Sequence, residues 1–233
     1  MRPTAFLALL LSSAAPAQAL DMLVYPNAGI FDIDDGGRIA GPGAAMLDRL
    51  RNLSGTQLEP KVIPFARALL AESLQPGTCL IALTRTPERE ARYRWAGPWS
   101  SSVIALYGRT GETRQVKGPE DMRGARIAAL RAAPTATWLQ ERGLDAYEVN
   151  DVAAGLRLLQ AGRVDYWLGN DMVTRLALKA SGAAMPRVLY SFGRIDLYVA
   201  CHIATPAAIV DRLNAGLTQL RVNGELAEFG LGR

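Results

Sequence analysis

The stretch from Leu80 to Ser102, LIALTRTPEREARYRWAGPWSSS, decides how the rest of the chain is interpreted. Its first four residues are apolar and predict a buried strand. The strand then stops at the hydroxyl and guanidinium side chains of Thr84–Arg89. In open α/β sheets the loops after the carboxyl ends of strands carry the polar groups that bind ligands. This stretch therefore predicts a ligand site at the end of a strand.

Composition and charge set the class of protein. The 233 residues are 49% hydrophobic and 21% charged, which is enough to bury a core in one large or two small domains. The formal net charge is +4, but the arginines are scattered, and the densest group is interrupted by Glu88 and Glu90. Because nucleic-acid binding needs clustered positive charge, we expect no nucleic acid partner.

Residues 1–19 have the pattern of a secretory signal peptide. Arg2 precedes the apolar run 5–11, and Ala17-Gln18-Ala19 supplies the small residues of a cleavage site. Nothing later reaches the roughly 18 uninterrupted apolar residues of a membrane helix. No cysteine follows the cleavage site, which argues against a lipoprotein. We expect a periplasmic mature protein that starts near Leu20; a retained N-terminal anchor is the alternative.

Strand and helix patterns alternate along the mature chain, as in α/β proteins with parallel sheets. We expect strands at 23–25, 80–83, 103–107, 126–130, 147–150, 164–168 and 195–203. We expect helices at 46–53, 68–74, 135–142, 152–161, 172–180 and 206–220. The chain shows no internal repeat, so two domains would be alike in architecture only.

The order of a strand, the segment Thr84–Arg89, an aromatic residue and Gly97-Pro98-Trp99 resembles bacterial solute-binding protein family 3. These extracytoplasmic receptors feed polar amino acids and similar solutes to ABC importers. The resemblance covers most of the mature chain and implies a two-lobed α/β fold of the type II periplasmic-binding kind, each lobe a mostly parallel sheet flanked by helices. It places lobe 1 at 20–101 and 198–233 and lobe 2 at 102–197, and 223–229 resembles a closing helix.

The resemblance also implies which residues of lobe 1 contact the ligand. Arg89 matches the arginine that clamps a carboxylate, and its planar guanidinium suits bidentate binding. Thr84 would offer a hydroxyl, and the backbone around Ala82 would accept a hydrogen bond from an ammonium group. The alternative for Arg89 is an ion pair with Glu88 or Glu90 at a solvated helix start.

Further candidates line the same expected cleft. Arg67 stands where many amino-acid receptors of the family place an aromatic ring, and a second cation there would favour an anionic ligand. Its alternative is a side chain that reaches solvent. Tyr25, Trp95 and Trp99 are aromatic rings that can stack on a ligand. We expect Trp95 to pack in the core. Trp99 lies beside the expected hinge and is the best ligand-stacking candidate of the three. Arg85 is a weaker candidate, because strand alternation aims it away from the threonines on either side.

Two departures from the family pattern fall in lobe 2. The family usually has a Gly-Thr pair at a helix start where this chain has residues 131–135, which lack the glycine. Here Thr135 can cap the helix and Arg131 can attract an anion. The acid that meets an α-ammonium group aligns with Asn170, beside Asp171. If Asp171 does not turn into the cleft, an α-amino acid loses its countercharge, and a buried ammonium without one is costly.

Cys79 and Cys201 are the only cysteines. In an oxidising compartment such a pair suggests a disulfide, although two buried thiols are also possible. On the two-lobed arrangement, adjacent antiparallel strands would bring them within disulfide range.

The sequence therefore predicts a binding protein that captures a small carboxylated solute, amino-acid-like or another organic anion, as a monomer that delivers it to an ABC permease in the inner membrane. We expect no metal, no cofactor and no catalysis, because no catalytic or metal-binding motif is present and His202 reads as a packed residue. Three alternatives stay open. One is an enzyme similar to cyclohexadienyl dehydratase, with Asp171 or Asp165 as the acid or base. The others are a periplasmic sensing subunit without a permease and a structural export protein.

Overall fold

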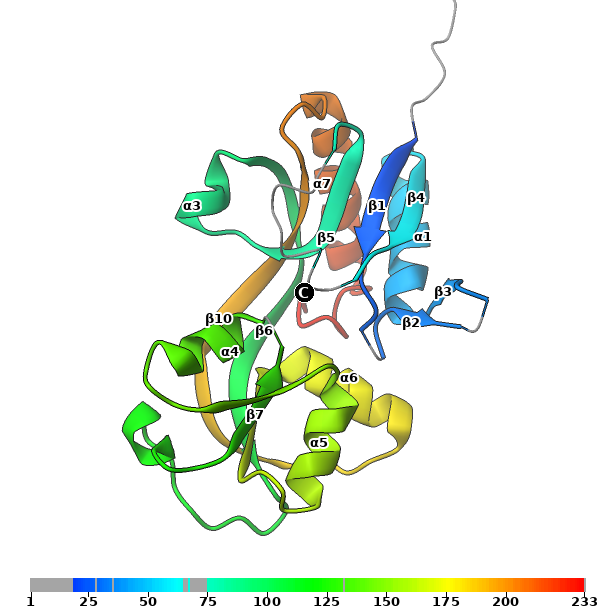
Figure 1. The fold of residues 1–233 in the computed structure, drawn as a ribbon. Coiled ribbons are helices and arrows are strands. Elements are labelled where there is room, and N and C mark those ends of the chain that lie inside the picture. The colour runs from blue at the N-terminus through cyan, green and yellow to red at the C-terminus, as the bar shows by residue number, and fades with distance from the viewer. Residues whose placement is uncertain are drawn as a thin grey trace, which may run out of the picture.

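A computed structural model describes residues 19–27, 29–34, 36–64, 67, 75–131 and 133–232. The expected signal peptide before Ala19 and the expected helix at 68–74 lie outside these residues. Figure 1 shows two groups of helices and strands joined by two long strands, β6 (Tyr93–Gly108) and β10 (Arg187–His202). We call the upper group lobe 1 and the lower group lobe 2. The mixed α/β fold agrees with the expected fold class, and the residues at which the lobes divide stay a prediction.

Eight strands form one curled sheet in the order β4-β1-β5-β10-β6-β9-β7-β8. Lobe 1 contributes β1 (Leu20–Val24), β4 (Leu58–Val62) and β5 (Thr78–Thr84). Lobe 2 contributes β7 (Ile127–Leu130), β8 (Ala146–Val149) and β9 (Tyr166–Asn170). A small hairpin pairs β2 (Asp32–Ile33) with β3 (Ile39–Ala40). In the eight-stranded sheet the strands within each lobe are parallel, whereas β6 and β10 run antiparallel to each other and to β9 and β5, respectively.

The helices flank this sheet. Lobe 1 carries α1 (Pro42–Ser54), α7 (Ala207–Val222) and the short α3 (Pro87–Glu90). Lobe 2 carries α4 (Pro134–Gln140), α5 (Val152–Gln160), α6 (Asp171–Ser181) and the 3-10 turn η2 (Pro119–Met122). No helix in the described part of the chain has the length and apolar character needed to cross a membrane.

The sequence interpretation missed β4, and three other elements differ most from their predicted bounds. Strand β6 was expected only at 103–107, because Gly97 and Pro98 interrupt the apolar pattern; instead the Gly97 N–H donates to Asn214 Oδ1 of α7 at 2.9 Å, and the strand continues past it. Strand β10 begins at Arg187 rather than 195; the apolar residues of its first half are exposed or only partly buried, and Gly193 separates them from the buried second half. The expected closing helix at 223–229 is a series of turns.

The strand registers bring the carboxyl ends of parallel strands from both lobes to the same place. Strand β5 ends at Thr84, opposite Leu197 of β10, and Leu197 lies opposite Ser100 of β6. Strand β9 ends at Asn170, opposite Ile104 of β6. Ser100 and Ile104 are about 13 Å apart along an extended strand. The ends of β5 and β9 therefore face each other across a short middle section of β6 and β10. We call the region between these two strand ends the gap.

The lobes also touch along α6. One buried apolar cluster includes Phe31 of lobe 1 and Leu176 of lobe 2. A Cβ atom at Gly29 would lie 2.5 Å from the Leu176 carbonyl oxygen, so only glycine allows this close approach. Lys179 of α6 forms an ion pair with Glu228 in the turns after α7. These contacts pack the two lobes against each other on the α6 side.

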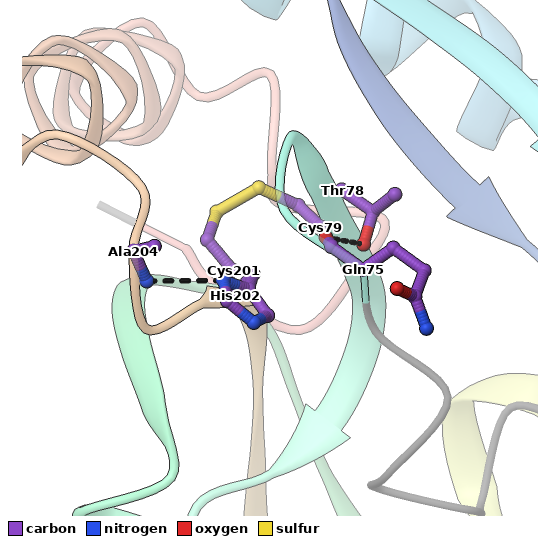
Figure 2. Close-up of a disulfide and its surroundings, with 6 residues drawn as sticks. All are labelled: Gln75, Thr78, Cys79, Cys201, His202 and Ala204. Carbon is purple, nitrogen blue, oxygen red and sulfur yellow. Dashed lines mark hydrogen bonds between the residues drawn. A yellow bond between two sulfur atoms is a disulfide. The ribbon is translucent and has the colours of Figure 1, made fainter.

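Cys79 and Cys201 form a disulfide, as expected (Figure 2). They lie directly opposite each other on the antiparallel strands β5 and β10, and both are fully buried. His202 is half-buried, and its Nδ1 accepts a hydrogen bond from the Ala204 N–H at 3.0 Å. The disulfide ties the outer end of β5 to β10, the strand that returns from lobe 2.

Ala82 provides a test of the backbone of β5. It has φ 69°, a positive value that costs an L-residue about 1–2 kcal/mol, while glycine adds about 0.5–1 kcal/mol of unfolded-state entropy. We expect Ala82→Gly to change the free energy of unfolding by between zero and about +1 kcal/mol. Ala105→Gly, at a buried, regularly paired position of β6, should lower it by about 1 kcal/mol. Equal losses in urea unfolding would contradict the positive φ.

Candidate functional site

Arg89 lies beside the lobe 1 side of the gap. Its Nη1 donates to the Thr84 carbonyl oxygen at 3.2 Å, which anchors α3 to the end of β5. Of the lysines and arginines in the described part of the chain, only Arg51 and Arg89 are half-buried rather than exposed. Arg51 pairs with Asp48 at 3.0 Å, whereas Arg89 has no carboxylate partner among the described residues. Its charge acts on Glu88: a hydrogen bond to Thr86 and, less strongly, the Arg89 guanidinium lower the pKa of that exposed carboxyl. The half-buried guanidinium is therefore left without a carboxylate in ion-pair contact.

Neither acid of the alternative for Arg89 forms a direct ion pair with it: Glu88 is exposed and interacts with Arg89 only at longer range. Glu90 pairs with Arg85, whose Nε donates to Glu90 Oε2 at 2.7 Å. The Arg85 guanidinium also lies 5.7 Å from the ring centroid of Trp95 and 5.6 Å from that of Tyr198. The bond to Arg85 lowers the pKa of Glu90, so this carboxylate stays charged and occupied. Because Glu90 pairs with Arg85, this carboxylate is not available to Arg89.

Strand β5 is irregular just before Thr84. The pairing with β10 shifts register between Tyr198 and Ala200, and Ala82 has no residue opposite it on either neighbouring strand. A positive φ at an alanine is uncommon and is held only where the surrounding structure determines it. The Thr84 side chain is half-buried, and its hydroxyl makes no hydrogen bond within the described residues. The predicted polar groups of β5 are thus grouped at one bulged strand end.

The aromatic candidates differ in how deeply their rings are buried. Tyr25, at the end of β1, packs half-buried against the apolar cluster of Leu80, and burial raises its pKa to about 12. Trp99 is 1% exposed and packs between Phe31 and Phe229, with ring centroids 6.2 and 5.2 Å away. Its ring has no surface left for a ligand, so we correct the sequence interpretation and remove Trp99 from the candidate site. Arg67 is exposed, and its neighbours 65–66 and 68–74 lie outside the described residues.

On the lobe 2 side, Thr135 does not cap α4. Ala133 occupies the N-cap position without a side-chain bond, and Thr135 is buried inside the first turn of a seven-residue helix. Arg131 is exposed and pairs with Glu148 at 3.3 Å. Thr135 supplies no side-chain cap and Arg131 already has a carboxylate partner, so this corner of the predicted site is weaker than expected.

Asn170 and Asp171 lie where β9 ends and α6 begins. Asn170 Oδ1 accepts the Val173 N–H at 3.2 Å and so caps α6. Asp171 Oδ1 accepts the Tyr107 hydroxyl at 2.7 Å, and its Oδ2 accepts Arg175 Nε at 2.8 Å. Burial first, and then this hydrogen bond to Asp171, raise the pKa of Tyr107. Both residues predicted to meet the ligand are thus engaged in the structure of lobe 2 itself.

Sequence reasoning missed the serines of the middle section of β6. Ser101 Oγ donates to Asp196 and accepts from Arg194 Nε at 2.6 Å, and Ser102 Oγ accepts the Met172 N–H at 2.9 Å. These bonds join β6 to β10 and to α6 between the lobes. A run of three serines within an apolar strand is the signal that was available, because buried hydroxyls need partners.

Other possible sites are weaker. A surface hollow of about 480 Å³ lies between β8 and α5, away from the gap. No group of three or more histidine, cysteine, aspartate or glutamate side chains is placed to hold a metal ion in the part of the chain that the structure describes. The gap with Arg89 remains the best-supported candidate site.

Comparisons with known proteins place the fold. No protein-family model matches the sequence. No curated protein matches it either. Among solved structures, a P235GK mutant of ArgBP from T. maritima is 16% identical, with 90% of this chain and 92% of that one covered and a TM-score of 0.72. A histidine kinase sensor domain with similarity to periplasmic binding proteins is 19% identical, with 91% and 94% covered and a TM-score of 0.73. The ancestral amino acid-binding protein AncCDT-1, a precursor of cyclohexadienyl dehydratase, is 17% identical, with 91% and 93% covered and a TM-score of 0.71. The chain therefore has the type II fold of periplasmic binding proteins.

Proposed function

We propose that this protein captures a small carboxylated solute in the gap between its lobes, with the Arg89 guanidinium as the anchor. The observation that carries the proposal is the half-buried Arg89, which has no carboxylate partner in the described part of the chain and lies next to the end of β5. A guanidinium presents two parallel N–H groups that match a carboxylate, and such charge-assisted pairs are stronger than neutral ones. A bound carboxylate would supply the missing ion-pair partner.

The neighbouring groups extend this site. We assign the Thr84 hydroxyl and the Ala82 carbonyl oxygen to polar contacts with the solute, Tyr25 to its apolar part, and Arg67 to the positive potential around it. Closure of the lobes would exclude water, and the lower dielectric would strengthen the contact with Arg89. Asn170 and Asp171 border the gap from lobe 2 rather than anchoring the solute.

Export and delivery complete the proposal. The signal-like residues 1–19 support a periplasmic location, and the type II fold supports capture for an ABC permease by a monomer. A second candidate is a sensing subunit, which is favoured by the similarity to a histidine kinase sensor domain. A dehydratase-type enzyme is less well supported, because Asp171 is held by Tyr107 and Arg175, and Asp165 pairs with Arg126 at 3.1 Å.

A thermal-shift screen of the mature protein tests the proposal. Millimolar dicarboxylates, branched and aromatic acids, opines and amino acids would each be added, and binding would be verified by calorimetry. We expect at least one carboxylated compound to raise the melting temperature, since a ligand that binds only the folded state stabilises it. Uncharged amides of the same compounds serve as controls. A screen in which no carboxylate raises the melting temperature more than its amide would refute the proposal.

A further inference from the structure

The acid nearest to the gap in lobe 2 already has two partners. Asp171 uses Oδ1 to accept the Tyr107 hydroxyl at 2.7 Å and Oδ2 to accept Arg175 Nε at 2.8 Å, and 22% of its side chain is exposed. Tyr107 is fully buried, so its hydroxyl would be left unsatisfied if Asp171 turned away. The first turn of α6 further stabilises the carboxylate where it lies. Asp171 is therefore held toward the interior of lobe 2.

The acids on the other sides of the gap are occupied in the same way. Glu90 accepts from Arg85 Nε at 2.7 Å, beside the α3 turn. Asp196 of β10 accepts the Ser101 hydroxyl and has Arg194 Nε 3.6 Å away. Each of these carboxylates is thus matched with a cation of the protein itself. Glu88 of α3 is exposed and forms no ion pair in the described part of the chain; a hydrogen bond to Thr86 and the charge of Arg89 lower its pKa. Arg89 is the half-buried cation of this region that has no carboxylate in direct contact among the described residues.

This distribution of charge bears on which carboxylated solute fits. An ammonium group brought into the gap would lose water. The described carboxylates there already have cationic partners, apart from the solvent-exposed Glu88 beside Arg89. It would also approach Arg89, and like charges repel more strongly as water is excluded. A solute that carries only carboxylate groups meets neither cost. We infer that the site selects small organic acids without an ammonium group over the corresponding α-amino acids, an inference that rests on the proposed capture of a carboxylate by Arg89.

Matched pairs of ligands that differ only in the ammonium group test this selectivity. Titration calorimetry on the mature protein would compare glutarate with L-glutamate, succinate with L-aspartate, and 4-methylpentanoate with L-leucine. We expect the acid without the ammonium group to bind at least about tenfold more tightly in whichever pair binds, a difference of roughly 1.4 kcal/mol. Equal or tighter binding of the amino acid would overturn the inference and leave capture of a carboxylate standing. If no pair and no other carboxylate bound, both proposals would fail.

A variant of the partner of Asp171 tests the physical cause. Arg175 is exposed, and Arg175→Ala leaves one oxygen of Asp171 without its cation. We expect the preference for the organic acid to shrink severalfold in this variant and to return when Asp171→Asn is added. Arg157→Ala, at another exposed arginine of lobe 2, is the matched control and should leave the preference unchanged. If Arg175→Ala and Arg157→Ala changed the preference equally, the pairing of Asp171 would not be the cause of selectivity, and the inference would be overturned.

Discussion

Arg89→Gln is expected to weaken binding of the carboxylated solute by about 30- to 200-fold, or about 2–3 kcal/mol, the range for a hydrogen bond to a charged group in a partly desolvated site. Glutamine removes the charge and is two bonds shorter than arginine, so it also gives up the hydrogen bond from Arg89 Nη1 to the Thr84 carbonyl oxygen, now 3.2 Å long. The lost affinity would then reflect the charge, the paired N–H groups and any shift of α3, and the melting temperature of the ligand-free variant measures the last of these. Calorimetric titration of the wild type and the variant, with the same solute, measures the difference.

Two further variants separate charge from shape. Arg89→Lys keeps the positive charge but lacks the planar fork, and it should fall between the wild type and Arg89→Gln, with a loss of about tenfold. Arg92→Gln changes an exposed arginine just after α3 and should bind within about twofold of the wild type, because exposed charges contribute little. A wild-type affinity in Arg89→Gln would remove Arg89 from the site and the proposed function with it.

Replacing both cysteines with alanine is expected to lower the free energy of unfolding by about 4–5 kcal/mol on the loop-entropy account. The bond joins residues 122 positions apart, so its loss frees a long closed loop in the unfolded chain. For a chain of this size, that corresponds to a melting temperature lower by roughly 10 °C. Urea unfolding of the wild type and of the Cys79→Ala/Cys201→Ala variant measures the change.

The control for this experiment is the chemically reduced wild type, which should unfold near the midpoint of the double variant. Solute binding at saturating concentration should survive in the double variant, because the disulfide lies toward the outer end of β5 and the candidate site lies at Thr84. Identical midpoints with and without reductant would show that the bond contributes nothing to stability.

The sequence predicted the fold better than it predicted the site. The alternation of strands and helices and the pairing of Cys79 with Cys201 were correct because they depend on local apolar patterns and on topology. The length of β6 was not, since Gly97 and Pro98 break the apolar pattern although the Asn214 side chain keeps the backbone in the sheet. Such a contact between distant segments leaves no mark in the local sequence.

The pairing of charged side chains was the feature of the structure that the sequence predicted least well. Arg89 and Glu90 are neighbours in sequence, and only the position of the Trp95 and Tyr198 rings explains why Arg85 takes Glu90. Likewise, Asp171 looked available for a ligand, because nothing in the local pattern placed the Tyr107 hydroxyl beside it. Pairing between charged groups depends on tertiary contacts that strand and helix patterns do not encode.

The path of the chain through the sheet has a consequence for the order in which the protein folds. Strand β5 gains its neighbour β10, and α1 gains its neighbour α7, only from the last part of the chain. The elements of lobe 2 lie on one uninterrupted segment between β6 and β10. A polypeptide that emerges from synthesis amino end first can therefore assemble lobe 2 early. The first half of lobe 1 would stay incompletely packed, and accessible to chaperones and proteases, until the final helix has emerged.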